Sequence, residues 1–353
     1  MKLNNMETPA LIVDMDLLEE NARIMNKILE KSGISLRPHY KSHKCPHLAH
    51  LQIKLGAKGI TCAKLSEAED LILSGIDDVL IANQITMPSK ISRVAYLAGC
   101  CHLTVCVDKA DNIAALETAA AFENTTIHCL VEYEIGMNRC GVKTPEEFLA
   151  LAKQIESSPH LFFEGIQAYA GNNSHELNYE VRKGRSEESE LRIRELIDYV
   201  KRAGLTIKEV SGDGTGTAEF RKPGTVYTEV QAGSHLFMDQ AYGAMNLSFK
   251  SSLFLLVQVI NISGNWVITD GGRKSISVDS ANPIFRDYPN VPIRVNDEHS
   301  LIPLEHCRAA VGDRLLMVPA HVCTAFNLHD WVYLVRNEKV IDRVPITSRG
   351  KSI

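Results

Sequence analysis

The chain has 353 residues, of which 45% are hydrophobic, and a formal net charge of −5 at pH 7. This length suits a barrel of about 250 residues plus a smaller module. The acidic balance and the scattered basic residues argue against a nucleic acid or an anionic membrane as a partner. No apolar run approaches membrane-spanning length and no hydrophobic signal core precedes Asp14, so we predict a cytoplasmic protein.

Strand-length apolar runs alternate with helical periodicity for more than two hundred residues. A strand at Ala10–Asp14 and a helix near Leu17–Lys31 come first. Eight further strands are predicted at residues 35–41, 59–63, 78–83, 103–108, 126–133, 161–169, 207–212 and 226–232. Predicted helices separate most of them, at Leu48–Leu55, Ser66–Ser74, Ser89–Ala98, Asn112–Ala121, Pro145–Glu156 and Glu176–Ala203. This alternation predicts parallel strands with right-handed crossovers, and eight such units close a (β/α)8 TIM barrel.

The pattern changes near Ser234, where helical periodicity ends. The β-rich pieces that follow are separated by Gly, Pro and Asn, at Leu253–Ile260, Asn265–Thr269, Arg314–Val318 and Val332–Arg336. We therefore predict a barrel domain over residues 11–234 and a C-terminal β-domain over residues 235–353, with the early strand near residues 1–14 added to the β-domain.

Lys41 ends the first predicted barrel strand, in the segment Leu36–Cys45. Barrels of this kind place their chemistry at the carboxyl ends of the strands. A lysine there can form a Schiff base with a carbonyl group, including the aldehyde of pyridoxal phosphate. An arbitrary lysine at a strand end is more often simply solvated. The other strand ends favour the functional interpretation.

Three further candidate residues follow the fifth and sixth barrel strands. Arg139 lies just after the fifth strand, Tyr169 ends the sixth, and His175 lies in the loop beyond it. Arg139 as a surface arginine paired with a glutamate and Tyr169 as a half-buried core residue are the plain alternatives. His175, in a polar loop, is a candidate general base.

The segment Gly212–Thr217 follows the seventh strand and is rich in glycine and threonine. Glycine lets backbone N–H groups approach an anion, and threonine adds hydroxyl donors. Loops after strands seven and eight of such barrels are common phosphate sites. An ordinary tight turn is the alternative, but a strand-end lysine in the same barrel favours phosphate. Ser234, after the eighth strand, joins this set.

A second cluster lies in the predicted β-domain, where His321 and Cys323 are two residues apart. In an extended segment both side chains point to the same face, which would make a two-ligand divalent-metal site with open positions. A thiolate ligand favours zinc over magnesium or manganese. The turn-rich segment Asp270–Asp279 is expected near this site, with a plain hairpin as the alternative.

Taken together, these residues resemble the fold-type III pyridoxal-phosphate enzymes, specifically the D-threonine aldolase and D-serine dehydratase family. The resemblance covers nearly the whole chain, and the order and spacing of its markers make it specific. The markers are Thr8–Asp14, Arg37-Pro-His-x-Lys41, Gly136–Gly141, Gln167-Ala-Tyr169-x-Gly171 with His175, Gly212–Thr217, Gln231–Ser234, Asp270–Asp279, His321-x-Cys323 and Asn327–Trp331.

The resemblance implies a barrel with a C-terminal β-domain, a homodimer, and a small-molecule D-3-hydroxy amino acid as substrate. Lys41 would hold the cofactor covalently, Arg139 would contact its phenolic oxygen and Tyr169 would line its ring. Gly214, Thr215, Gly216 and Ser234 would lie near its phosphate. His321 and Cys323 would hold the metal that contacts the β-hydroxyl of the substrate.

The sequence leaves two reactions open. At the metal, the aldolases of the family look like His-x-Asp and the dehydratases like His-x-Cys, and this chain has His-x-Cys. In contrast, its segment Gln167–His175 and its Gly-Thr-Gly-Thr loop resemble the aldolase branch. We predict retro-aldol cleavage, with His175 and Lys41 as catalytic residues, and keep β-elimination by a D-serine or D-3-hydroxyaspartate dehydratase as the alternative. An amino acid racemase and a non-catalytic pyridoxal-phosphate carrier are weaker alternatives.

Overall fold

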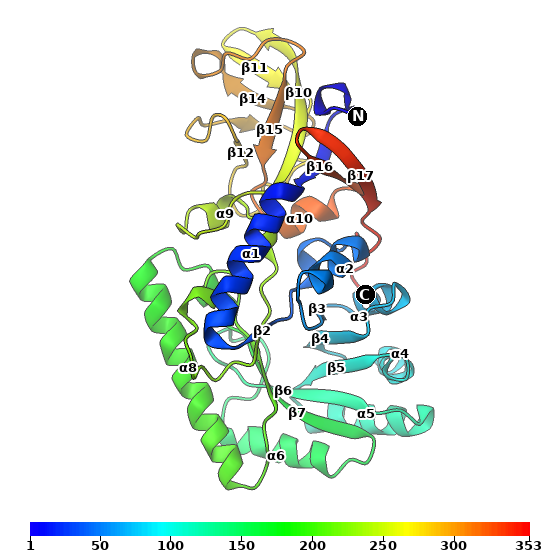
Figure 1. Ribbon diagram of the computed structural model, residues 1–353. Helices are drawn as coiled ribbons and strands as arrows, with labels where there is room; N and C mark the ends of the chain where they lie inside the picture. Colours follow the sequence, from blue (N-terminus) through cyan, green and yellow to red (C-terminus); the bar gives the residue numbers. More distant parts are fainter. The chain divides into compact units, whose positions relative to one another are not determined.

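The computed structural model describes residues 1–353 and divides into two compact units. We call the first the β unit, made of Met1–Met25, Ser42–His47 and Ser234–Gly350. The second is the barrel unit, made of Asn26–Lys41, Leu48–Gly233 and Lys351–Ile353 (Figure 1). The chain passes between the units five times, and two of these crossings lie within helices α1 (Met15–Ser32) and α2 (Pro46–Lys54).

The barrel unit contains an eight-stranded parallel sheet in the order β2-β9-β8-β7-β6-β5-β4-β3. Its strands are β2 (Ser35–Leu36), β3 (Ile60–Cys62), β4 (Asp78–Gln84), β5 (His102–Val107), β6 (Ile127–Glu132), β7 (Leu161–Ala168), β8 (Glu209–Gly212) and β9 (Glu229–Val230). A parallel bridge between His39 and Thr61 joins the β2 end of the sheet to β3. Each of the eight strands falls within or next to its predicted range, although β2 and β9 are much shorter than predicted, and the barrel prediction is confirmed.

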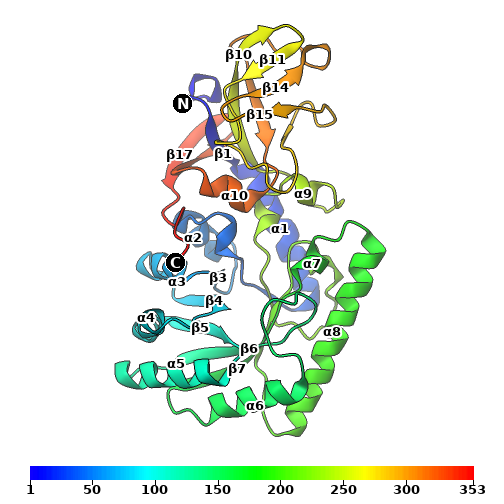
Figure 2. The ribbon, with the colours of Figure 1, turned by 180° about the vertical axis from the view of Figure 1, so that it is seen from behind.

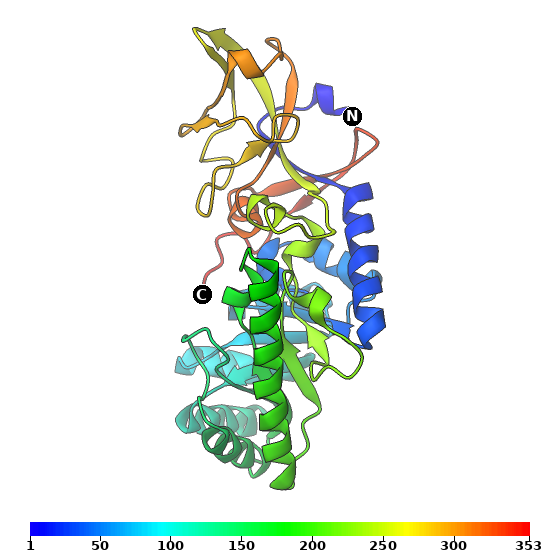
Figure 3. The same cartoon turned by 90° about the vertical axis from the view of Figure 1, so that its left-hand side faces the viewer.

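Helices alternate with these strands as expected. They are α3 (Leu65–Leu73), α4 (Pro88–Ala98), α5 (Ala110–Glu123), α6 (Pro145–Glu156), α7 (Gly171–Ser174) and α8 (Tyr179–Arg202). Local sequence explains α6, where Pro145 occupies the first turn and the Thr144 hydroxyl accepts a hydrogen bond from the Glu147 N–H at 3.2 Å. The single helix expected over Glu176–Ala203 is shorter, and the separate turn α7 precedes α8 (Figure 3). No helix has both the length and the apolar character needed to cross a membrane.

The inner face of the barrel is filled by side chains at alternate strand positions. Leu80 of β4, Cys106 of β5 and Leu130 of β6 are fully buried and form one apolar cluster there. Their strand neighbours Leu103 and Val105 belong instead to the large core shared with the helices. Polar residues on the inner face therefore lie on either side of this apolar layer, toward the amino or the carboxyl ends of the strands.

The barrel is closed at β2 with few backbone hydrogen bonds, because β2 has only two residues. The Lys58 N–H donates to the Leu36 carbonyl at 2.8 Å, and the Thr61 N–H donates to the Pro38 carbonyl at 2.9 Å. The buried Arg37 adds ion pairs to Glu229 at 2.8 Å and Asp78 at 2.5 Å, at the amino ends of β9 and β4. We call this region the seam.

The β unit is built on a second sheet, whose main path runs β13-β14-β11-β10-β1-β16-β17, with β15 paired to β10 and β12 (Figure 2). β1 (Ala10–Asp14) pairs antiparallel with β10 and parallel with β16. The other strands are β10 (Leu253–Ser263), β11 (Trp266–Thr269), β12 (Ile284–Phe285), β13 (Arg294–Val295), β14 (Ser300–Pro303), β15 (Arg314–Val318), β16 (Trp331–Arg336) and β17 (Lys339–Pro345). The mostly-β character predicted for this part of the chain is confirmed. It also holds two short helices, α9 (Gln240–Gly243) and α10 (Val322–Asn327).

Candidate active site

Lys41 lies in a short 3-10 turn, Tyr40–Ser42, which follows the bridge residue His39. The strand predicted over residues 35–41 is therefore too long, because β2 ends at Leu36. The turn has a local cause, since the Lys41 N–H donates to Nδ1 of His39 at 3.3 Å, and such side-chain bonds compete with strand ladders. Lys41 nevertheless remains at the carboxyl side of the barrel, as predicted.

A cavity of about 200 Å³ surrounds the Lys41 side chain. Its lining includes three of the predicted residues, Lys41, Arg139 and Tyr169. Nζ of Lys41 lies 5.7 Å from the centroid of the Tyr169 ring, so the amine and the aromatic face share one space. The sequence prediction missed part of the polar lining: His39, Asn83, Gln84, Cys140, Gln167 and Gln231. Four of them, His39, Cys140, Gln167 and Gln231, lie within the marker segments of the family resemblance but were given no role.

Arg139 lines the cavity from the loop after β6, and Glu134 holds this loop in shape. Oε1 of Glu134 accepts hydrogen bonds from the N–H groups of Gly136 at 2.6 Å and Asn138 at 2.9 Å. Beneath the loop, Glu132 accepts a hydrogen bond from Gln84 at 2.5 Å. Burial raises the pKa of Glu132, and the nearby charge of Arg139 acts in the opposite direction. Glu132 thus positions the side chain of Gln84, which lines the cavity.

The loop Gly212–Thr217, which we call the glycine loop, packs against Tyr169. A Cβ added at Gly214 would lie 2.4 Å from Oγ of Ser174 and 3.7 Å from the Tyr169 ring, so no larger residue fits there without a shift. Asp213 holds the loop in shape, since its Oδ1 accepts hydrogen bonds from the Gly214 N–H at 3.0 Å and from the Thr217 hydroxyl. Arg221 pairs with the other oxygen of Asp213 at 2.9 Å.

Two backbone N–H groups of the glycine loop, those of Thr215 and Gly216, make no hydrogen bond within the chain. Both residues are buried, and buried N–H groups are almost always paired. Unpaired donors beside a glycine cradle are the arrangement that binds a phosphate group. An amine, an aromatic face and this cradle in one unit fit the three parts of pyridoxal phosphate: aldehyde, ring and phosphate.

We expect Gly214→Ala to weaken pyridoxal-phosphate binding about tenfold, because the added methyl group displaces Ser174 or the loop from its place. Titration of the apoprotein followed by fluorescence or absorbance measures this affinity. Gly184→Ala is the matched control, since nothing lies within 4 Å of a Cβ at Gly184 in α8. Equal cofactor affinity in the two variants would remove the glycine loop from the phosphate site.

The predicted residues of the glycine loop lie beside the cavity rather than in its lining, and two further predicted residues, His175 and Ser234, also lie outside the lining. His175 ends the short helix α7 and is exposed in the barrel unit. Ser234 begins the 3-10 turn Ser234–Leu236 of the β unit, where its carbonyl accepts the N–H groups of Phe237 and Met238. Their roles stay predictions.

In the β unit, His321 and Cys323 lie at the start of helix α10, not in an extended segment as predicted. His321 is the N-cap residue, with φ −148° and ψ 124°, and Cys323 lies in the first helical turn. Two residues across a helix start can still face each other, because only the first of them has extended dihedral angles. Cys323 raises the pKa of His321, so the two side chains lie near each other, and their role as metal ligands stays a prediction.

Asp279 completes this cluster, as expected for the Asp270–Asp279 segment. Its Oδ2 lies 2.8 Å from Nδ1 of His321, and its Oδ1 accepts the Thr324 hydroxyl at 2.7 Å. A carboxylate on one ring nitrogen fixes the imidazole and leaves Nε2 for a metal ion. The hydrogen bond with Cys323, together with Asp279, raises the pKa of His321 to about 9, so a metal ion that binds there displaces a proton. The nitrogen and sulfur donors suit zinc.

Comparison with known proteins agrees with this geometry. The family model of the alanine racemase N-terminal domain matches residues 13–241, and that of a serine dehydratase domain matches residues 252–335. The chain is 38% identical to the D-threonine aldolase of Arthrobacter sp and 37% identical to the 3-hydroxy-D-aspartate aldolase of Paracoccus denitrificans. Each alignment covers 99% of this chain and 94% of the relative.

The chain belongs to the D-threonine aldolase and D-serine dehydratase family. This family is pyridoxal-phosphate-dependent, and its aldolases and dehydratases are metal-dependent lyases. The crystal structure of D-threonine aldolase from Filomicrobium marinum superposes with a TM-score of 0.95 at 34% identity, over 100% of this chain and 98% of that one. The D-threo-3-hydroxyaspartate dehydratase of Delftia sp. HT23 shares the fold, with a TM-score of 0.88 at 22% identity over 98% of both chains.

Proposed function

We propose that this protein is a pyridoxal-phosphate- and divalent-metal-dependent lyase that cleaves D-3-hydroxy amino acids to glycine and an aldehyde. The main support for pyridoxal-phosphate binding is the cavity that Lys41 and Tyr169 share beside the glycine loop. The aldolase reaction is supported by the two aldolases that are 37–38% identical over nearly the whole chain.

In this proposal the barrel unit binds the cofactor. Lys41 holds its aldehyde carbon, Tyr169 lines the ring, Arg139 donates to the phenolic oxygen, and the N–H groups of Thr215 and Gly216 hold the phosphate. Bound pyridoxal phosphate supplies an electron sink for the bonds at the substrate Cα.

His321 and Cys323 would hold the metal ion, with Asp279 orienting His321. Among the solved Delftia dehydratase structures are alanine variants of a histidine and of a cysteine two positions after it, and the cysteine variant is described as metal-free. This chain has the same spacing. The ion would supply a Lewis acid for the β-hydroxyl of the substrate, and the thiolate favours zinc over manganese or magnesium.

His175 is the proposed base that accepts the proton of the β-hydroxyl as the Cα–Cβ bond breaks and the aldehyde leaves. His175 lies four residues after Gly171. Gly171 packs closely against Tyr169, since a Cβ at Gly171 would lie 2.9 Å from the Tyr169 ring. The exposed imidazole can exchange its proton with water after each turnover.

We expect His175→Asn to keep cofactor binding and to lower retro-aldol turnover by about 10²- to 10⁴-fold, the usual share of a general base. Aldehyde release coupled to a dehydrogenase measures this. His50→Asn is the matched control, since His50 is also an exposed histidine of the barrel unit and bonds the Ser74 carbonyl at 2.8 Å. Undiminished aldehyde release from the His175 variant would assign the base to another group.

The second candidate function is β-elimination to a 2-oxo acid and ammonia. It is favoured by one observation, the cysteine at position 323, because the dehydratase branch resembles His-x-Cys at this place. In that reaction Lys41 would remove the Cα proton and the β-hydroxyl would leave as water. Both reactions would use the same cofactor and metal residues. Aldol cleavage breaks the Cα–Cβ bond with His175 as the base, whereas elimination breaks the Cα–H and Cβ–O bonds with Lys41 as the base.

The deciding experiment incubates the metal-loaded holoenzyme with D-threonine, D-serine and D-3-hydroxyaspartate in turn. Glycine with one equivalent of aldehyde supports the aldolase, and ammonia with one equivalent of 2-oxo acid supports the dehydratase. Inversion at Cα with neither product would indicate a racemase. The homodimer and the cytoplasmic location stay predictions.

A further inference from the structure

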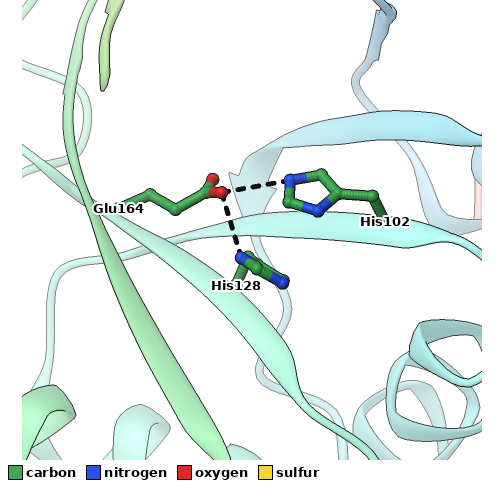
Figure 4. A group of neighbouring side chains, drawn as sticks. All are labelled: His102, His128 and Glu164. Atoms are coloured by element: carbon green, nitrogen blue, oxygen red, sulfur yellow. Dashed lines mark ion pairs between the residues drawn. The ribbon is translucent and has the colours of Figure 1, made fainter. Parts of the chain in front are cut away.

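A second group of metal-ligand side chains lies inside the barrel, at the opposite ends of the strands from Lys41. His102 is the first residue of β5, His128 the second of β6, and Glu164 lies in the first half of β7 (Figure 4). Their ligand atoms lie within 4.8 Å of one another. We propose that these three side chains bind one divalent transition-metal ion of the zinc class.

The positions of the three residues follow from the strand register. Thr104 of β5 pairs with His128 of β6, and His102 lies two residues before Thr104, on the same inward face. Glu164 reaches this face through a bulge, because its neighbours Phe163 and Gly165 pair with consecutive residues of β6 and leave it unpaired. Bulges of this kind often redirect a side chain toward a functional site.

The distances suit a metal ion. Oε1 of Glu164 lies 3.0 Å from Nε2 of His102 and 3.0 Å from Nδ1 of His128. In a tetrahedral zinc site with bonds of about 2.1 Å, neighbouring ligand atoms lie about 3.4 Å apart, so the group needs only small side-chain rotations. Two imidazoles and one carboxylate are a known zinc ligand set that keeps a fourth position for water.

The surroundings support a built site rather than a chance contact. The Thr104 hydroxyl donates to Oε2 of Glu164 at 3.0 Å and so orients the carboxylate. The ring of Phe162 packs on His128 with centroids 5.1 Å apart. The side chains of His102, His128 and Glu164 are 39%, 23% and 12% exposed, so an ion can enter from solvent on the His102 side.

This group is separate from the cofactor cavity. Glu132, at the carboxyl end of β6, is four residues beyond His128, which is about 13 Å along a strand. The apolar layer of Leu80, Cys106 and Leu130 lies on the same inward face between the two ends. A metal ion bound here would therefore link β5, β6 and β7 rather than contact substrate.

The neighbouring charges leave room for a cation. The hydrogen bond with Glu164 raises the pKa of His102 against the effect of burial, Asp78 adds to the rise and Arg37 opposes it. Asp78 and Arg37 are already ion-paired with each other at 2.5 Å. The Nζ of Lys208 lies 4.3 Å from the centroid of the Phe162 ring, the same ring that packs on His128. Glu164 is thus the only acidic partner that both histidines share.

Zinc binding to the full-length holoenzyme tests the proposal, and His321→Ala serves as the background because it removes the other metal site. We expect this variant to bind one zinc per chain in equilibrium dialysis and to melt several degrees higher with zinc. Adding His128→Gln or Glu164→Gln should weaken this binding at least about 100-fold and abolish the rise. Adding His160→Gln, a matched control that breaks the single His160–Glu117 pair, should change neither.

A second measurement needs no substitution in the group itself. Cobalt bound to the His321→Ala variant should show weak visible bands without the thiolate-to-metal absorption that Cys323 would give. No bound zinc in the His321→Ala variant, or equal binding after His128→Gln, would overturn the proposal and leave an ordinary histidine–glutamate ion pair. Failure here is distinct from failure of the proposed function, which His321 and Cys323 test separately.

Discussion

Lys41→Ala should yield a folded protein that lacks the near-visible absorption of lysine-bound pyridoxal phosphate. The Nζ atom lies in the cavity 5.7 Å from the Tyr169 ring, and its amine is the group proposed to hold the aldehyde. Lyase activity should fall by at least about 10³-fold, because covalent attachment and proton transfer are lost together. Absorbance spectra and product assays on the reconstituted protein measure both effects.

Lys54→Ala is the control for this prediction, since Lys54 is an exposed lysine at the end of α2. It should keep the spectrum and the activity of the unmodified protein. Borohydride reduction followed by peptide mapping gives an independent answer. A label on an amino group other than that of Lys41 would contradict the assignment and with it the proposed function.

His321→Ala should lose bound metal at the start of α10 and more than about 100-fold of the activity, and added zinc should not restore it. The imidazole is one of the two proposed ligands and is oriented by Asp279, so its removal leaves a single thiolate ligand. One thiolate cannot hold a divalent ion at ordinary concentrations. Metal analysis after dialysis, in which this variant should hold one zinc per chain fewer than the unmodified protein, and turnover with excess zinc measure the two losses.

The control is His306→Ala, because His306 is an exposed histidine of the same unit that pairs only with the adjacent Glu305, at 3.4 Å. It should keep both metal and activity. Full activity of His321→Ala without bound metal would show that the ion is not needed for turnover. Activity restored by added zinc would instead mean that His321 only strengthens binding.

The sequence predicted the barrel well because its signals are local and repeated. Strand-length apolar runs and helical periodicity mark each unit, and helix α6 was predicted with its observed ends. The residue types at the strand ends, Lys41 and Tyr169 among them, were also sufficient to predict a shared site, since parallel strands bring their carboxyl ends together.

Other features depend on contacts that a single sequence does not show. The turn at Lys41 depends on a side-chain bond from His39, and the convergence of His321 and Cys323 depends on a helix that begins between them. The cavity residue Gln84 lies one position beyond the strand predicted over residues 78–83, and nothing in the sequence marked it as a site residue. Glu164 reaches the inner face through a bulge, and a period-two pattern cannot register an extra residue.

The seam next to Lys41 has a consequence for the dynamics of the barrel. Because the two-residue β2 contributes so few ladder bonds, this is where the closed sheet should open most easily. Local opening would carry His39, and the lysine two residues later, away from Thr61. A cofactor bound both to Lys41 and to the opposite wall of the cavity would hold the two sides of the seam together. Cofactor binding and the stability of the closed barrel are therefore thermodynamically linked.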